Sequence, residues 1–459
     1  MKSLGFLLVV VGVTVAGTSC STSRPLADGP PPRPLGGDLP AYQTPGAPEK
    51  VKVSPGVWQE PSAPLALRDA WAAALMHNPG LAAFSWELRA AEARLLQESL
   101  LPNPEIEWET EGVGGQGEYR GTRAAESTLA VSQALELGGK RPKRTQVALR
   151  ERELAGWDYQ RKRLDLLTEV TQAFLDVLAA QERLAVVEER VGVSQQVLGA
   201  VAQRVEAGKD SALQKTKAQV ALSQARIERQ QIGQELESAR RRLAGFWGGR
   251  APVFERATGR FYEVLSLPSE GVLWARAVQN PDLARWDTEM DRQRAALALA
   301  QARGAPDVSV SAGLKQYNET DDRAFMLGLS VPLPLFDRNQ GGVLEAKCNL
   351  VRAELERQDA EASLYRALAE TYGQLCNAYT EAVGLRDEVV PGAEGAFAAA
   401  TEEYGQGKLD YLGLLDAQQT LFETRAQYID ALASYHKAKA EVERIVGQAV
   451  EDIQESGRQ

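Results

Sequence analysis

The sequence predicts a chain that is mainly α-helical and contributes strands to a membrane β-barrel. Three observations lead to this: the body is duplicated, each copy runs in the order α-β-β-α-α, and the strands alternate polar with apolar residues. Hydrophobic residues make up 44% of the chain and charged residues 25%, and the body lacks the runs of about 20 apolar residues that transmembrane helices need. A bundle of membrane-spanning helices is therefore excluded.

Three segments of the first half return in the second half. Residues 77–81 return at 279–283 and 104–106 at 306–308, both 202 residues later, and 206–219 return at 405–418, 199 residues later. An offset this long indicates duplication, because solenoid repeats are about 20–50 residues long. The copies are expected at residues 65–249 and 268–447, with a connecting equatorial segment at 250–267 and a C-terminal tail at 448–459.

The N-terminus carries an export signal. Lys2 precedes an apolar run at residues 4–16, which is too short to span a bilayer and predicts a signal peptide over residues 1–19. The following Cys20 ends a segment that resembles a bacterial lipoprotein cleavage box, so we expect Cys20 to be lipidated. The alternative is an ordinary signal peptide in which Cys20 is incidental.

A proline-rich linker follows the signal. Eleven of the 22 prolines fall within residues 21–64, a composition that favours an extended spacer over a packed core. Residues 20–64 are thus expected to be a lipidated cysteine and a linker, and the folded body to begin near Leu65.

Each copy begins with a helix and continues into two strands. Pro79 and Pro281 stand where a helix start tolerates proline, and helical spacing follows over about residues 80–101 and 281–303. Period-two alternation then predicts four strands, at about residues 104–113, 127–137, 306–317 and 324–333.

The first strand has an acidic face. Its odd positions are carboxylates, and its even positions are Ile106, Trp108 and Thr110. The carboxylates are Glu105, Glu107, Glu109 and Glu111. Such alternation suits lipid on one side and water on the other, so we expect these four to line a cation-preferring pore. The alternative is a solvated strand face outside any pore.

Long helices follow each pair of strands. Uninterrupted helical stretches are expected over about residues 143–205 and 338–403, each followed by a glycine-containing turn and a shorter helix, about 210–246 and 409–446. At 1.5 Å per residue these are roughly 95 Å and 55 Å long, and the helix before the strands adds roughly 33 Å. The two shorter helices placed end to end nearly match the long one, as in a cylinder wall. A solvated coiled-coil rod is the alternative.

Four strands cannot enclose a water-filled lumen. An open sheet in lipid would leave its edge N–H and C=O groups unpaired at several kcal/mol each, so several chains must pool their strands. A soluble sandwich packed on the apolar strand faces is the alternative.

Composition and motifs exclude several functions. The net charge of -10 and pI near 5.2 argue against nucleic-acid binding. Three cysteines and two histidines are too few for a metal centre or a disulfide framework, and Cys348 and Cys376 are expected to be packing residues. No nucleophile elbow, P-loop, zinc-protease helix or dinucleotide fingerprint occurs, so we expect no enzyme and no cofactor.

The chain resembles the TolC-like outer-membrane efflux factor (OEP) family. Leu137-Gly138-Gly139-Lys140-Arg141 after the second strand and Leu101-Pro102-Asn103-Pro104 before the first resemble its heavy-metal efflux, CzcC-like branch. The resemblance implies a homotrimer whose 12-stranded β-barrel in the outer membrane continues into a long periplasmic α-helical barrel. It also implies a passive exit duct that docks to a periplasmic adaptor and an inner-membrane pump of the RND type, with heavy-metal cations as a substrate class.

Two other functions remain open. The duct could serve a protein or peptide secretion system, or the chain could be a structural periplasmic coiled-coil lipoprotein. Barrel formation in lipid separates both ducts from the lipoprotein, and the partner pump separates the two ducts.

The helical turns farthest from the strands are the expected adaptor-docking tips, because they are the end exposed in the periplasm. Their residues are Gly208, Lys209, Asp210, Gly407, Lys408 and Leu409.

The tips are also expected to hold the gate. The resemblance implies closure by aspartates and a Tyr–Arg–Asp network; this chain keeps Tyr404 and Asp416 but has Gly413 and Leu409 at the other two positions. Lys217 is the repeat partner of Asp416, so we expect these two opposite charges to approach one another near the constriction. Ordinary solvated helix charges are the alternative.

A basic cluster follows the second strand, at Lys140, Arg141, Lys143 and Arg144. It is expected at the level of the lipid headgroups, where it would hold the depth of the barrel. The alternative is simply a charged helix start, although basic residues are electrostatically unfavourable there.

Overall fold

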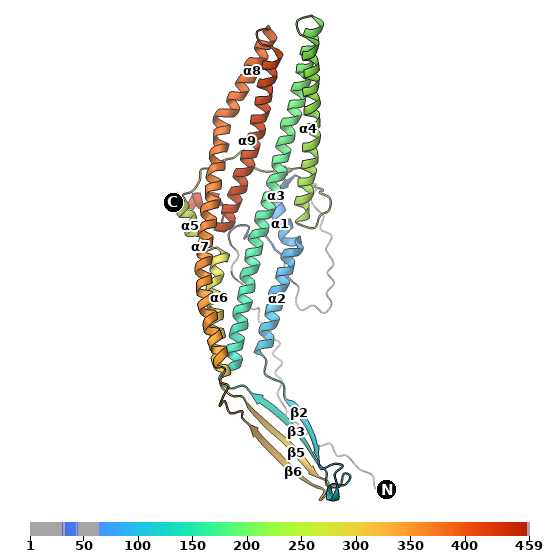
Figure 1. The fold of residues 1–459 in the computed structure, drawn as a ribbon, viewed down its shortest axis with the longest axis vertical. Helices are drawn as coiled ribbons and strands as arrows, with labels where there is room; N and C mark the ends of the chain where they lie inside the picture. Colours follow the sequence, from blue (N-terminus) through green and yellow to red (C-terminus); the bar gives the residue numbers. More distant parts are fainter. Residues whose placement is uncertain (1–29, 31–32, 43, 45–63, 457–459) are drawn as a thin grey trace.

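The computed structural model describes residues 30, 33–42, 44 and 64–456. These form an elongated molecule with four strands at one end and helices over the rest of its length (Figure 1). The first repeat comprises α1 (Leu67–His77), α2 (Pro79–Ser99), β2 (Glu105–Glu111), β3 (Glu126–Leu135), α3 (Lys140–Glu206) and α4 (Ala212–Gly245). The second comprises α5 (Glu270–Ala277), α6 (Pro281–Arg303), β5 (Val308–Tyr317), β6 (Asp322–Ser330), α7 (Gln340–Gly384), α8 (Val390–Gln406) and α9 (Tyr411–Val446).

These elements match the predicted strands and helices to within a few residues. The repeats begin close to the expected residues, and each opens with a short helix, α1 or α5, ahead of α2 or α6. A two-residue parallel pair, β1 (Leu65–Ala66) with β4 (Ala257–Thr258), ties the connecting segment to the first repeat. The signal peptide and Cys20 lie outside the described residues.

The four long strands form one antiparallel sheet in the order β2-β3-β5-β6. Its register sets Glu105 opposite Ser132, and Ser132 opposite Ser311. On the other face Trp108 is opposite Leu129, and Leu129 is opposite Leu314. The sheet thus has a polar and an apolar face, and β2 and β6 each pair with only one neighbour in the described chain.

The repeated Asn-Pro pair joins helices end to end. Asn78 caps α2 by accepting the Leu81 N–H at 2.9 Å, and its amide donates to the Phe246 carbonyl at the end of α4 at 2.8 Å. Asn280 does the same in the second repeat, capping α6 and donating to the Arg444 and Ile445 carbonyls at the end of α9 at 3.1 and 2.5 Å. The predicted stacking of two shorter helices beside one long helix is therefore held by one asparagine in each repeat.

Replacing Asn280 by Ala is expected to lower the free energy of unfolding by about 2–4 kcal/mol, since a helix cap is lost and two carbonyls in a buried site lose their donor. Asn280→Ser keeps a capping oxygen without the amide donor and should cost less. Asn377→Ala, at an exposed position of α7, is the matched control and should change stability by less than about 0.5 kcal/mol. Denaturant unfolding in detergent measures this, and equal stability of Asn280→Ala and the wild type would contradict the assigned role.

The second long helix is not uninterrupted, so that expectation was wrong. Five residues, Leu385–Val389, form a π-helical segment between α7 and α8, and Pro391 follows at the start of α8. Proline lacks the N–H that an α-helix requires, and one π-turn absorbs the change of hydrogen-bond register. The first repeat has no such break, because α3 runs through 67 residues.

The core begins upstream of Leu65. Leu35 is buried in the main apolar cluster, which also includes Leu167, Phe174 and Phe254. The buried Arg163 side chain on α3 donates to the Leu35 carbonyl at 3.3 Å. Part of the expected linker is thus docked on the helices. The C-terminal tail also packs, through Val450 and Ile453 of the short helix α10 (Val450–Ser456).

None of the helices in the described part of the chain combines the length and apolar composition needed to cross a membrane.

Candidate functional site

The acidic ladder, defined as Glu105, Glu107, Glu109 and Glu111, lies on the polar face of the sheet. All seven residues of β2 are exposed in the single chain. Across the face, Glu107 is in register with Ala130 and Gly313, and Glu109 with Thr128 and Lys315. The ladder therefore faces small or polar side chains.

One cation partly balances this face. Lys315 Nζ lies 2.5 Å from a carboxylate oxygen of Glu126 and 3.6 Å from one of Glu111. Glu126 on β3 and Asp322 on β6 lie in the same row across the sheet as Glu111. Together with the acidic ladder they give this face six carboxylates and one lysine in each chain. Among the described residues, no ion pair reaches Glu105, Glu107 or Glu109. The arrangement concentrates negative charge on the face that water would occupy.

The turns at the opposite end of the molecule close in the same way in both repeats (Figure 1). Gly208 and Gly407 have φ of +67° and +75°, and the following Lys209 and Lys408 donate their N–H groups to the carbonyls of Arg204 and Glu403 at 2.8 and 2.9 Å. This bonding satisfies the last carbonyls of each helix and needs glycine at the left-handed position. Both lysines are exposed, and Asp210 and Leu409 are partly buried.

A polar cluster joins the two tips, and we call Arg204, Asp210 and Tyr404 the tip clamp. The Tyr404 hydroxyl donates to Asp210 Oδ2 at 2.7 Å, and Arg204 Nε lies 2.8 Å from the same oxygen. Arg204 also donates to the Tyr404 carbonyl at 3.1 Å and stacks on the Tyr404 ring, with its Cζ 4.7 Å from the centroid. The α3–α4 hairpin is therefore joined to the α8–α9 hairpin by a hydroxyl–carboxylate hydrogen bond, a guanidinium–carbonyl hydrogen bond and a cation–π contact.

The tip clamp sets the charge states of its members. The hydrogen bond from Arg204 lowers the pKa of Asp210, and the Tyr404 hydroxyl adds to this. Burial, together with the bond to Asp210, raises the pKa of Tyr404. At neutral pH the clamp is thus a carboxylate bound by a guanidinium and a neutral phenol.

Gly413 and Leu409, the two residues that depart from the family pattern at the tip, fit one another sterically. A Cβ on Gly413 would lie 2.6 Å from Leu409 Cδ1, so glycine at 413 leaves room for leucine at 409. The arginine of the tip clamp comes instead from α3, at Arg204, which the sequence analysis did not identify. Arg204 lies six residues before Asp210, across the turn, and that spacing is the only signal the sequence offers.

Lys217 and Asp416 are both exposed in the single chain, on α4 and α9. No ion pair between them occurs within the described chain, so their predicted approach stays a prediction.

Within the described residues, no three His, Cys, Asp or Glu side chains lie where they could together hold a metal ion. Cys348 is exposed in the single chain and Cys376 is partly buried, so within one chain the expected packing role does not hold for Cys348.

The family model for "Outer membrane efflux protein" matches residues 71–249 and 275–448. The cobalt-zinc-cadmium resistance protein CzcC of Cupriavidus metallidurans is 35% identical over 389 residues, covering 85% of this chain and 91% of that protein. The nickel-cobalt-cadmium resistance protein NccC of Alcaligenes xylosoxydans xylosoxydans is 27% identical over 292 residues, covering 62% of this chain and 66% of that protein.

A solved structure of CusC superposes with a TM-score of 0.70 at 17% identity, covering 90% of this chain and 99% of the CusC chain. The segments matched by the family model nearly coincide with the two repeats. The chain therefore belongs to the outer membrane efflux protein family and is an efflux channel of the outer membrane with a periplasmic extension.

Proposed function

We propose that three copies of the chain form a passive exit duct for heavy-metal cations delivered by a periplasmic adaptor and an RND-type inner-membrane pump. The observation that carries the substrate class is the acidic ladder on the polar face of the sheet. Rings of carboxylates raise the local concentration of cations without binding them tightly, as a duct requires. The metal resistance named for CzcC and NccC supports the same class. As channel relatives imply, the chain acts without catalysis or a cofactor.

Barrel closure supports the trimer. The sheet has two edges, at β2 and β6, and an apolar face with Trp108, Phe325 and Leu327 exposed. In lipid the edges need partners, which β6 of one copy and β2 of the next supply. Three copies give 12 strands, which are enough to enclose a water-filled lumen. The four strands of one sheet are too few to do so. The helices of three copies would then continue this lumen into the periplasm, with Cys20 lipidated in the membrane.

The glycine turns with Lys209, Asp210, Lys408 and Leu409 are proposed as the docking site for the adaptor. They lie farthest from the sheet and present both exposed lysines.

Restored metal tolerance tests the proposal. In a bacterium that carries a cation pump and adaptor but lacks its own outer-membrane component, expression of this chain should restore growth in zinc, cobalt or cadmium. A chain that is present in the outer membrane and leaves tolerance unchanged would favour the secretion duct.

The gate pair Lys217 and Asp416 is proposed to act between neighbouring copies, since both side chains are exposed in the single chain. Asp416→Ala or Lys217→Ala should each give more frequent opening in single-channel recordings, and the double variant no further gain. A partly exposed pair contributes only about 0–1 kcal/mol, but three copies act on one gate. If all three variants gave traces identical to the wild type, Lys217 and Asp416 would have no role in the gate.

A further inference from the structure

The chain crosses between strands and helices at four places, and neighbouring crossings are linked to one another. The crossings are residues 100–104 (α2 to β2), 136–139 (β3 to α3), 304–307 (α6 to β5) and 331–339 (β6 to α7). We call these four crossings and their links the collar.

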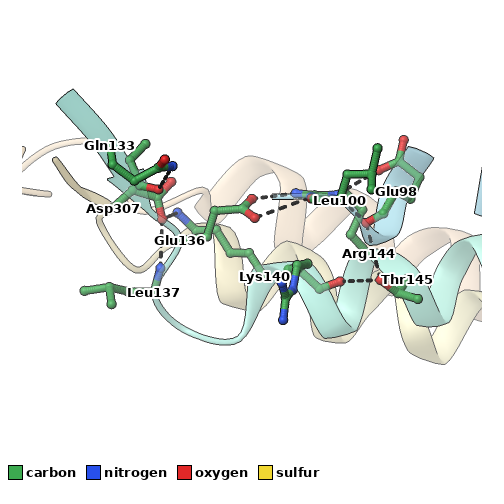
Figure 2. A network of polar contacts seen from close by, with 11 residues as sticks. Glu98, Leu100, Gln133, Glu136, Leu137, Lys140, Arg144, Thr145 and Asp307 are labelled. Carbon is green, nitrogen blue, oxygen red and sulfur yellow. Dashed lines mark hydrogen bonds and ion pairs between the residues drawn. The ribbon is translucent and has the colours of Figure 1, made fainter. Parts of the chain in front are cut away.

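Arg144 of α3 links the first crossing to the second (Figure 2). Its guanidinium donates to the Glu98 and Leu100 carbonyls at the end of α2, at 3.2 and 3.3 Å. It also lies 2.8 Å from the Glu98 carboxylate and 2.5 Å from the Glu136 carboxylate, just beyond β3. One side chain therefore pairs with two carboxylates and satisfies two carbonyls at a helix end.

Lys140 links the second crossing to the third. Its Nζ lies 2.8 Å from Asp307 Oδ1, and the same oxygen accepts the Leu137 N–H at 3.0 Å (Figure 2). The backbones are close here, since a Cβ on Gly138 would lie 2.9 Å from Ala305 Cβ, and Gly138 has φ of +70°. In the Gly-Gly-Lys motif, Gly138 thus allows the two repeats to approach closely and Lys140 forms an ion pair between them.

Asn339 links the third crossing to the fourth. Its side-chain amide donates to the Ala300 carbonyl near the end of α6 at 2.7 Å. A Cβ on Gly304 would lie 2.7 Å from the Arg338 carbonyl oxygen, so these crossings also touch through their backbones.

The strand register explains why basic residues start α3. Pairing of β3 with β5 ends at Leu135 opposite Val308, and one further step sets Glu136 opposite Asp307. Like charges directly opposite one another destabilise a sheet. The first turn of α3 carries no acidic residue, although acidic residues are favoured there by the helix dipole. Lys140 in that turn and Arg144 just after it instead supply one cation for each of the two carboxylates.

We propose that Lys140 and Arg144 are positioning residues that seat the strands on the helices by neutralising Asp307 and Glu136. The Lys140 side chain is only 12% exposed and that of Glu136 only 13%, which suits a partner within the protein better than a lipid headgroup. By strand alternation Glu136 and Asp307 continue the face of the acidic ladder, because Ala134 pairs with Ser309. Removing Lys140 therefore also adds an unbalanced carboxylate at the inner mouth of the lumen.

A charge swap tests the collar. Lys140→Glu and Asp307→Lys should each lower the yield of outer-membrane trimer by about fivefold, because each leaves a pair of like charges at the crossing. The double variant Lys140→Glu/Asp307→Lys should recover part of the lost yield, as expected for a direct pair, but not all of it, because the Leu137 N–H loses its acceptor at Asp307. Arg141→Glu is the matched control: Arg141 is exposed on the same turn, and its reversal should leave the yield unchanged.

A second readout separates positioning from mere stability. Lys140→Gln should shift the reversal potential in a salt gradient further toward cations, and Lys140→Arg should restore the wild-type value. The proposal is overturned if Arg141→Glu reduces the trimer yield as much as Lys140→Glu does and the Lys140→Glu/Asp307→Lys variant does not recover the yield. That result would indicate that the basic residues bind lipid headgroups. It is equally overturned if Lys140→Gln changes neither yield nor selectivity. Because trimer yield needs no conduction, a wild-type trimer that conducts nothing would instead count against the proposed duct.

Discussion

Converting the four carboxylates of the acidic ladder to glutamine is expected to lower the cation-to-anion permeability ratio by about tenfold, because 12 negative charges would leave the lumen of the proposed trimer. Among the described residues no cation pairs with Glu105, Glu107 or Glu109, so these three should account for most of the change. Lys315 already offsets charge at the outer rung and should make Glu111 the least effective of the four.

Reversal potentials in a potassium chloride gradient measure this. The difference between variant and wild type should shrink at about 1 M salt, where the screening length falls to about 3 Å. Arg323→Gln is the control, since Arg323 pairs with Gln316 on the opposite face of the sheet and should leave the ratio nearly unchanged. A quadruple variant with wild-type selectivity would place the acidic ladder outside the pore.

Breaking the tip clamp should open the channel more often. Tyr404→Phe removes the hydrogen bond to Asp210 at a position that is only 4% exposed, a loss of about 1 kcal/mol for each chain. Asp210→Ala removes the partner of both Arg204 and Tyr404 and should have the larger effect. Tyr411→Phe is the matched control, because Tyr411 is buried in the same apolar cluster and no described hydrogen bond involves its hydroxyl. Single-channel open probability is the readout, and equal values for Tyr404→Phe and Tyr411→Phe would contradict the clamp.

The tip clamp also predicts a pH response. The pKa of Asp210 is lowered, so its stabilising contribution is fully present above its ordinary value of 3.8 and is lost only as the pH falls through the lowered pKa. Mild acidification to pH 5 should therefore leave the clamp closed.

The sequence predicted the elements because each is encoded locally. Period-two alternation in β2 fixes both the strand and its faces, and Asn-Pro marks the starts of α2 and α6. The π-segment Leu385–Val389 has no periodic signal of its own, and Pro391 indicates a disturbed helix without specifying a π-turn.

The polar contacts between elements were predicted less well. The Asn280 amide binds carbonyls more than 160 residues away, and Arg204 meets Tyr404 only because two hairpins pack together. Neither contact leaves a periodic signal in the sequence. The opposition of Glu136 and Asp307 could have been read from strand alternation, but only once β3 was known to pair with β5. The docking of Leu35 was hidden by the surrounding prolines and glycines, whose composition is that of a spacer.

Three copies of this chain are proposed to close one barrel. Native mass spectrometry of the protein extracted from outer membranes should then show a single species with the mass of three mature chains. A monomer, a dimer or a ladder of open-ended oligomers would contradict it, because none of these pairs the β2 and β6 edges of three chains in one closed ring.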